Sequence, residues 1–204
     1  MSVHQAIQTT GRPVFTTREI ATLAGTSLSS ASQALSRMQK EGLVTRAARG
    51  IWCRTADPRF TPFLLVGYLS GGHRAYVSFF SALHLHGLIE QIPQVVFAAT
   101  TAHTRRRQTP VGTFSFHRIH PAFFSGFDWY RGGRSFLIAA PEKALVDCLY
   151  LSSRRGRRFG RFPELELGPK FSRRRAREWV KEIPYKKIRG YVSEKLSVLL
   201  RSSR

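Results

Sequence analysis

The sequence predicts an α+β protein in which an N-terminal winged helix-turn-helix precedes a mixed α/β domain with a small sheet and C-terminal helices. The first sixty residues contain, in order, two short helix patterns and a hairpin pattern, whereas residues 95–98 and 113–119 read as strands. The length of 204 residues and the 42% hydrophobic content suffice for two small cores. We therefore expect one unit over residues 1–58 and a second over residues 61–204.

The first helix of the predicted pair is marked by its N-terminal signals. Thr16 and Glu19 have the spacing of a capping box, in which each side chain satisfies a backbone donor of the other residue. Phe15 and Ile20 stand at the positions of a hydrophobic staple, and Gly25 stands where the helix should end. The apolar face is expected to continue through Ala21, Leu23 and Ala24.

The second helix, about residues 28–41 with Ser27 as its N-cap, separates an apolar stripe from a polar, cationic face. The expected stripe is Leu28, Ala31, Ala34, Leu35 and Met38. The candidate DNA-reading residues are Ser27, Ser29, Ser30, Gln33, Ser36, Arg37 and Lys40. A helix in the major groove needs such a face, because an amide pairs with adenine and a guanidinium with guanine. The alternative is an ordinary amphipathic helix with a polar outer side.

A short hairpin follows and completes the winged-helix pattern. Gly42 ends the second helix, and residues 43–46 and 51–54 read as strands joined by a turn over 47–50. The cationic residues predicted to lie on this wing are Arg46, Arg49 and Arg54. Such residues suit phosphate or minor-groove contacts, which position a domain without reading sequence. A winged helix that binds protein instead of DNA is the alternative.

The second unit is predicted to mix helices with a small sheet. Residues 61–70 form an apolar run, and residues 76–86 read as a helix with Ser78 as N-cap and Gly87 as its end. The predicted strands are 95–98, 113–119 and 134–139. Pro141 suits the first position of a further helix, in which its missing N–H costs nothing. The residues of that helix expected in the core are Leu145, Val146, Leu149 and Tyr150.

The charge is strongly positive and unevenly distributed. The formal net charge is +21, of which residues 1–60 carry +5, residues 61–152 carry +4 and residues 153–204 carry +12. A polyanion such as nucleic acid is the usual partner of so basic a chain. The arginines of a second basic patch are Arg154, Arg155, Arg157, Arg158, Arg173, Arg174, Arg175 and Arg177. They form either a second nucleic-acid-facing patch, on DNA or an RNA-like partner, or a solvated surface.

The tail after this patch is expected to be helical. The second arginine cluster begins a helix whose inner residues are Trp179 and Val180, and Pro184 interrupts it. A final packed helix is indicated by Ile188, Tyr191, Val192, Leu196, Leu199 and Leu200.

Two segments resemble the AbiEi family of antitoxins, which accompany nucleotidyltransferase-like AbiEii toxins in type IV toxin–antitoxin systems. The first runs from Tyr76 to Leu88, with Glu90-Gln91-Ile92-Pro93 after it, and the second from Ala139 to Leu149. With the winged helix, the resemblance extends to about residue 200. It implies a repressor that binds repeats in its own promoter and whose C-terminal part neutralises the toxin. The basic stretch 154–177 departs from the usual family pattern.

Catalytic and metal-binding patterns are weaker. His84 and His86 are two apart on a predicted helix and diverge, and no cysteine or acidic cluster joins His103, His117 and His120. Cys53 and Cys148 show no pairing signal. A nuclease-like acidic and lysine set is conceivable in Asp128, Glu142, Lys143 and Asp147, but Glu142 and Asp147 do not share a helical face closely. We expect no metal and no cofactor.

The leading hypothesis is therefore an autoregulatory DNA-binding repressor and antitoxin that is not an enzyme. Its expected partners are double-stranded DNA, at operator repeats of its own promoter, and a cognate nucleotidyltransferase-like toxin. We expect no membrane association and a cytoplasmic protein, because the chain contains neither a membrane-length apolar stretch nor a signal-peptide pattern. The alternatives are a metal-dependent nuclease guided by the winged helix, and a plain DNA-binding regulator without an antitoxin role.

Overall fold

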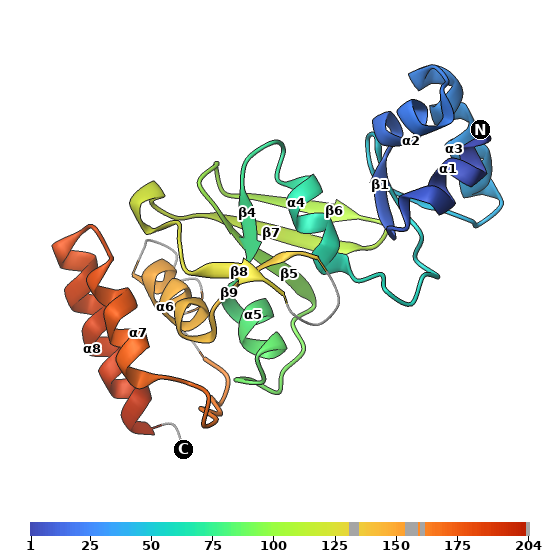
Figure 1. The fold of residues 1–204 in the computed structure, drawn as a ribbon. Helices are drawn as coiled ribbons and strands as arrows, with labels where there is room; N and C mark the ends of the chain where they lie inside the picture. The colour runs from blue at the N-terminus through green and yellow to red at the C-terminus, as the bar shows by residue number, and fades with distance from the viewer. Residues whose placement is uncertain (131–134, 154–158, 160–161, 203–204) are drawn as a thin grey trace.

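The structure, a computed structural model, describes the whole chain except residues 131–134, 154–158, 160–161 and 203–204. The described residues form a three-stranded sheet near the N-terminus and a six-stranded sheet further along the chain. Figure 1 shows the N-terminal unit at one end, the larger sheet in the middle and the last two helices at the other end. The α+β prediction is confirmed.

The N-terminal unit is a winged helix. Its elements are α1 (Val3–Thr10), β1 (Val14–Thr16), α2 (Thr17–Ala24), α3 (Leu28–Lys40), β2 (Thr45–Ala48) and β3 (Ile51–Cys53). The antiparallel strand order is β1-β3-β2. The capping box of Thr16 and Glu19, the Ser27 cap and the left-handed Gly25 at the end of α2 are all present, as predicted.

Two elements of this unit escaped prediction. The first is α1, although Ser2 and Gln5 form a capping box with the same spacing as that of α2. The second is β1, whose three residues pair with β3. Both complete the small core, whose buried residues are Ala6, Ile7, Phe15, Ile20, Leu35, Val44 and Trp52.

Two leucines predicted to face this core do not. Leu23 is 41% exposed and Leu28 is 50% exposed. They lie at the end of α2 and the start of α3, on either side of the turn over residues 25–27. A residue in the terminal turn of a helix can satisfy the helical period without lying over the core.

The second sheet is mixed, with the order β6-β7-β5-β4-β9-β8. Its strands are β4 (Ala75–Val77), β5 (Val95–Thr100), β6 (Arg105–Thr109), β7 (Gly112–Arg118), β8 (Phe127–Trp129) and β9 (Leu137–Ala139). The β4–β9 and β5–β7 pairs are parallel, and the others are antiparallel. The three predicted strands correspond to β5, β7 and β9, whereas β4, β6 and β8 were not predicted.

The helix predicted over residues 76–86 is partly wrong. Tyr76 and Val77 belong to β4, and the helix α5 spans only Phe79–Leu85. Ser78 lies at the N-cap position but makes no capping bond, because its hydroxyl donates to the Asp147 carboxylate at 2.7 Å. Phe79 has φ +56°, which turns the chain sharply from strand into helix.

Three helices build the end of the molecule away from the winged helix. They are α6 (Pro141–Ser152), α7 (Arg173–Lys181) and α8 (Lys186–Ser202). Pro141 occupies the first turn of α6, and every residue of α6 from Glu142 onward is buried. Figure 1 shows α7 and α8 side by side, packed outside α6. The predicted inner residues of the last helix are confirmed for Val192, Leu196 and Leu200, which are buried.

The two units touch through a strip of apolar contacts. Val14, Ala47 and Cys53 of the winged helix belong to the larger hydrophobic core. The Tyr68 hydroxyl, on α4 (Leu65–Leu69), donates to the Val14 carbonyl at 3.3 Å. The division into residues 1–58 and 61–204 stays a prediction, because buried residues of both segments share this core. No helix among the described residues is long and apolar enough to span a membrane.

Candidate nucleic-acid interface

The helix α3 is held on the winged-helix core by its buried side and capped at its start. Ala31 and Leu35 are completely buried. The Ser27 hydroxyl accepts a hydrogen bond from the Ser30 amide at 3.0 Å, and the two hydroxyls lie 2.9 Å apart. The hydroxyls of Ser27 and Ser30 thus already stabilise the helix start, which makes them less available to a ligand than the sequence suggested.

The outer side of α3 presents a polar and cationic face. Ser29, Gln33, Arg37 and Lys40 are exposed. None of these four side chains has a hydrogen-bond or ion-pair partner within the described part of the chain. A functional face needs such uncommitted donors, because a group already bonded within the protein must give up that bond before it can bind a ligand.

A shallow hollow of about 330 Å³ lies along this face, lined by Ser32, Gln33, Ser36, Arg37 and Lys40. Ser36 is only half exposed, and its hydroxyl donates to the Ser32 carbonyl at 2.8 Å. Ser32 was not among the predicted site residues. The helical period placed it near the edge of the polar face, next to Ser29 and Ser36, so the same period could have included it.

The predicted wing arginines lie in three different settings. Arg49 is exposed in the two-residue turn between β2 and β3, at the tip of the wing, beside Gly50 with φ +72°. Arg46 is exposed on β2, and its guanidinium lies over the Trp52 ring, 5.7 Å from the ring centroid. Only Arg49 therefore stands free at the wing tip.

The placement of Arg54 on the wing is wrong. Arg54 follows β3 at the base of the hairpin, where its guanidinium pairs with the Asp57 carboxylate and donates to the Gln8 side chain at 3.2 Å. Asp57 also accepts two hydrogen bonds from the Arg59 guanidinium. These bonds from Arg59, together with the charge of Arg54, lower the pKa of Asp57 well below its usual range. The contacts of Arg54 with Asp57 and Gln8 thus stabilise the segment that follows the winged helix.

Side-chain contacts hold the first turn of α2 against the rest of the winged helix. The Trp52 indole donates to the Thr17 hydroxyl at 2.8 Å and so ties β3 to the first turn of α2. Glu19 accepts from the Thr16 amide at 2.7 Å and pairs with Arg12 at 2.6 Å. Partial burial favours the neutral acid, but the bonds from Thr16 and Arg12 outweigh it and lower the pKa of Glu19.

The second predicted basic patch is described only in part. Arg173, Arg174, Arg175 and Arg177 are exposed on α7. Arg174 approaches Glu178 at 3.5 Å, and both side chains are largely solvated. The predicted members Arg154, Arg155, Arg157 and Arg158 lie outside the described residues.

The nuclease-like set is dispersed or sealed in the core. The Lys143 ammonium pairs with Asp147, and both side chains are 0% exposed. Glu142 is buried, with one carboxylate oxygen accepting from the Ser172 amide at 2.8 Å, whereas Asp128 is exposed on β8. Because the side chains of Lys143 and Asp147 are fully buried, a nucleic-acid phosphate cannot contact them in this structure.

The histidines named as possible metal ligands have separate partners and do not form one site. His86 contacts the Ala139 carbonyl at 2.7 Å, and His117 is buried beside the Ser115 hydroxyl at 3.0 Å. His120 accepts a hydrogen bond from the Ala122 amide at 3.2 Å. Among the residues that the structure describes, no three His, Cys, Asp or Glu side chains are grouped so as to hold a metal ion.

No curated protein matches the chain. A family model described as "Transcriptional regulator, AbiEi antitoxin" matches residues 9–55, which run from the end of α1 to the end of the wing. This match covers neither of the two later segments on which the sequence resemblance rests. Residues 9–55 are therefore similar to the same family that the two later segments resemble, and they lie outside those segments.

Proposed function

We propose that the chain is a transcriptional repressor that reads duplex DNA through α3 inserted in the major groove. The observation that carries this proposal is the row of uncommitted polar side chains on α3. Gln33 has the amide that pairs with adenine, and Arg37 has the guanidinium that forks onto guanine. Ser29 and Ser32 add small hydroxyls on the same side.

In this proposal, the wing positions the domain on the duplex and does not read the base sequence. Arg49 projects from the tip of the hairpin, and Arg46 lies on the adjoining strand. Contacts of this kind to phosphate fix the orientation of a domain on the duplex but carry no base information directly. We therefore assign base reading to Gln33 and Arg37, and backbone contact to Arg46 and Arg49.

The antitoxin part of the proposal rests on the family match. It includes binding to repeats in the promoter of its own operon and neutralisation of a nucleotidyltransferase-like toxin, in a protein that is not an enzyme. The second unit, built around the six-stranded sheet, is the part that we assign to the toxin. The burial of Lys143 and Asp147 supports the absence of nuclease activity.

The DNA-reading assignment is tested by selecting duplexes from a random library with the full chain and measuring mobility shifts. Replacing Gln33 or Arg37 by Ala should cost about 1 to 3 kcal/mol on the selected duplex and relax the preference for one base pair. Replacing Arg49 by Ala should weaken binding to the selected and the scrambled duplexes by a similar factor. Gln39→Ala is the control, because Gln39 is exposed on α3 but does not line the hollow.

The result that contradicts the assignment is an unchanged ratio of specific to scrambled binding in both the Gln33 and the Arg37 variants. The antitoxin role is tested separately by growth of cells that co-express the adjacent toxin gene and the full chain. A Gln33→Ala/Arg37→Ala variant should lose repression and still restore growth. Loss of growth rescue in a folded variant would show that the two roles share α3.

A further inference from the structure

The helices α7 and α8 carry a dense positive charge that the winged helix does not explain. Residues 172–201 contain ten Lys and Arg against three Glu. Six exposed members define what we call the α7–α8 basic surface: Arg173, Arg175, Arg177, Lys181, Lys186 and Lys187. The first four lie on α7, and Lys186 and Lys187 are the first two residues of α8.

The charges of this surface are largely unneutralised. Within the described residues, none of its six members forms an ion pair, and the neighbouring Arg174–Glu178 contact is long and solvated. The first turn of α7 contains arginines and no acidic residue. Cations near a helix N-terminus oppose the helix dipole, at about 0.3 to 1 kcal/mol each when exposed. A bound polyanion relieves both this opposition and the mutual repulsion.

Side-chain chemistry favours the phosphate backbone of a duplex as that polyanion. Guanidinium groups bind phosphate in a bidentate manner. Single-stranded nucleic acid requires aromatic platforms for its bases, and here the exposed aromatic residue is Tyr185, whose ring already packs on His120 at 5.3 Å. The centres of protein–protein interfaces are depleted in charged residues, unlike this surface.

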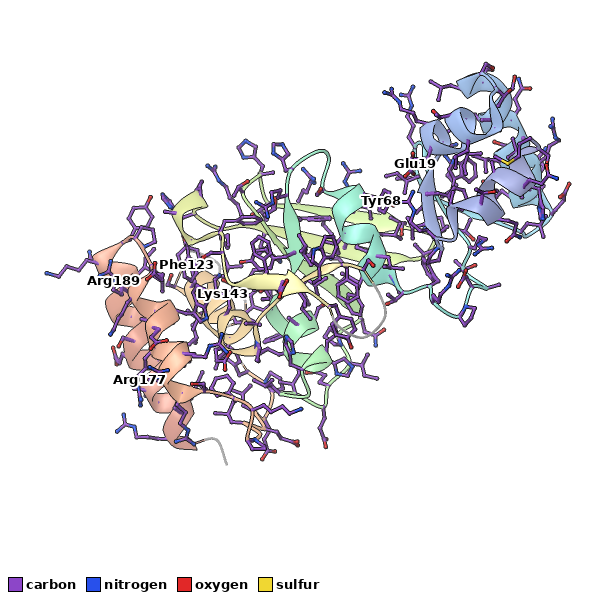
Figure 2. The ribbon with its side chains drawn as sticks, viewed as in Figure 1. Glu19, Tyr68, Phe123, Lys143, Arg177 and Arg189 are labelled. Atoms are coloured by element: carbon purple, nitrogen blue, oxygen red, sulfur yellow. The ribbon has the colours of Figure 1, made fainter. Side chains whose placement is uncertain are left out.

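The α7–α8 basic surface and α3 lie at opposite ends of the molecule. Figure 1 shows the six-stranded sheet between them, and Figure 2 shows Arg177 and Arg189 at the end away from Glu19. The helix pair is anchored on the buried helix α6, and Lys143 of α6 lies 6.0 Å from the Trp179 ring centroid of α7. A short duplex held by α3 therefore does not reach this surface.

We propose that the α7–α8 basic surface binds the backbone of a second duplex DNA segment without reading its sequence, so that one chain bridges two duplexes. Only the first duplex depends on the proposed function of α3. The second contact rests on the charge and placement of α7 and α8 alone.

The first test measures fluorescence anisotropy of a labelled scrambled 16-base-pair duplex, titrated with the full chain at several salt concentrations. R173Q/R175Q/R177Q should lower the log–log salt slope by up to about 2.7, since each lost phosphate contact removes roughly 0.9. The matched control R74Q/R106Q/R107Q also removes three exposed arginines, but outside both surfaces, and should change the slope by less than about 1. Circular dichroism checks that both variants are folded.

The second test measures bridging. A duplex selected by the chain is immobilised, protein is bound, and capture of the labelled scrambled duplex from solution is recorded. Wild type should capture it, whereas R173Q/R175Q/R177Q should occupy the immobilised duplex normally and capture at least several-fold less. If α3 does not read DNA, the chain binds the selected duplex no better than a scrambled one, while the anisotropy test still reports on α7 and α8.

Three outcomes overturn the proposal. One is an equal salt slope for wild type and R173Q/R175Q/R177Q. Another is an equal decrease of the salt slope in the control variant R74Q/R106Q/R107Q, which would mean that duplex binding depends on net charge alone. The third is preferential capture of double-stranded RNA, which would reassign the surface to a different nucleic acid.

Discussion

The buried pair of Lys143 and Asp147 makes a strong prediction about stability. Lys143 donates to Asp147 and to the Tyr76 hydroxyl, the latter at 3.1 Å, and its ammonium lies 3.8 Å from the Phe123 ring centroid. Asp147 also accepts from Ser78 at 2.7 Å and from Tyr76 at 3.1 Å. Figure 2 shows Lys143 and Phe123 inside the domain, beside the helix pair. Asp147→Asn removes the negative charge while keeping the shape of the side chain.

The expected cost follows from the stranded charge. Removing one partner of a buried pair destabilises a protein by about 3 to 5 kcal/mol. Burial already lowers the pKa of Lys143, and the Asp147 carboxylate opposes that change. Without the carboxylate, Lys143 can escape the penalty by losing its proton, which costs roughly 5 kcal/mol at pH 7 for an ordinary lysine. The cost at pH 7 should therefore lie near 3 to 5 kcal/mol.

This reasoning also predicts the pH dependence of the variant. Folded Asp147→Asn binds fewer protons than its unfolded chain, because the folded pKa of Lys143 lies below the unfolded one. Its stability should therefore rise relative to wild type between pH 7 and pH 9, by up to about 1.4 kcal/mol per pH unit.

Thermal denaturation followed by circular dichroism measures the effect. A loss of 3 to 5 kcal/mol corresponds to a Tm lower by about 6 to 20 °C for a chain of this size. The double variant Lys143→Met/Asp147→Asn is the control, since it carries no buried charge and should recover much of the loss. A deficit below about 1 kcal/mol at pH 7, or one that does not shrink at pH 9, would refute the reasoning.

Three further predictions concern single contacts. Gly126→Ala should lower Tm strongly, because Gly126 has φ +75° and an added Cβ would lie 2.7 Å from the Trp179 ring. The control is Gly168→Ala, whose Cβ meets no atom within 4 Å and which should be nearly neutral. Differential scanning calorimetry of both variants and wild type measures the difference in Tm. Thr16→Ala should cost about 1 kcal/mol through loss of the α2 cap, and an equal Tm for wild type and variant contradicts it. Asp57→Asn should be less stable than wild type at pH 7, and the difference should vanish in acid. The lowered pKa of Asp57 means that its contribution is present above the unfolded pKa and lost as pH falls through the folded pKa; a difference that persists at the lowest pH at which both proteins fold argues against it.

The winged helix was predictable because its signals are local. The capping box of α2 and the Ser27 cap each join residues three positions apart, and Gly25 and Gly50 adopt the left-handed conformation that glycine favours. The same local signals were present for α1 and could have been used. The candidate reading residues Ser29, Gln33, Arg37 and Lys40 follow from the helical period once α3 is known.

The second unit was less predictable because its contacts are distant in sequence. Residues 76–77 can continue the helical pattern of α5, but pairing of β4 with β5 and β9 makes them a strand. The six-strand order, the edge strands β6 and β8, and the position of Arg54 at the base of the wing also depend on tertiary neighbours.

The sequence by itself determined the winged helix, the polar face of α3, the strands β5 and β7 and the excess of charge near the C-terminus. Each of these follows from propensity, period or composition within a short window. Only the tertiary structure decided which charges are available. It placed Asp147 beside Tyr76 and Ser78, 71 and 69 residues earlier in the chain, and so sealed a Lys–Asp pair that resembled a reactive set. It left the arginines of α7 in solvent, because a charge is buried or exposed according to what packs around it.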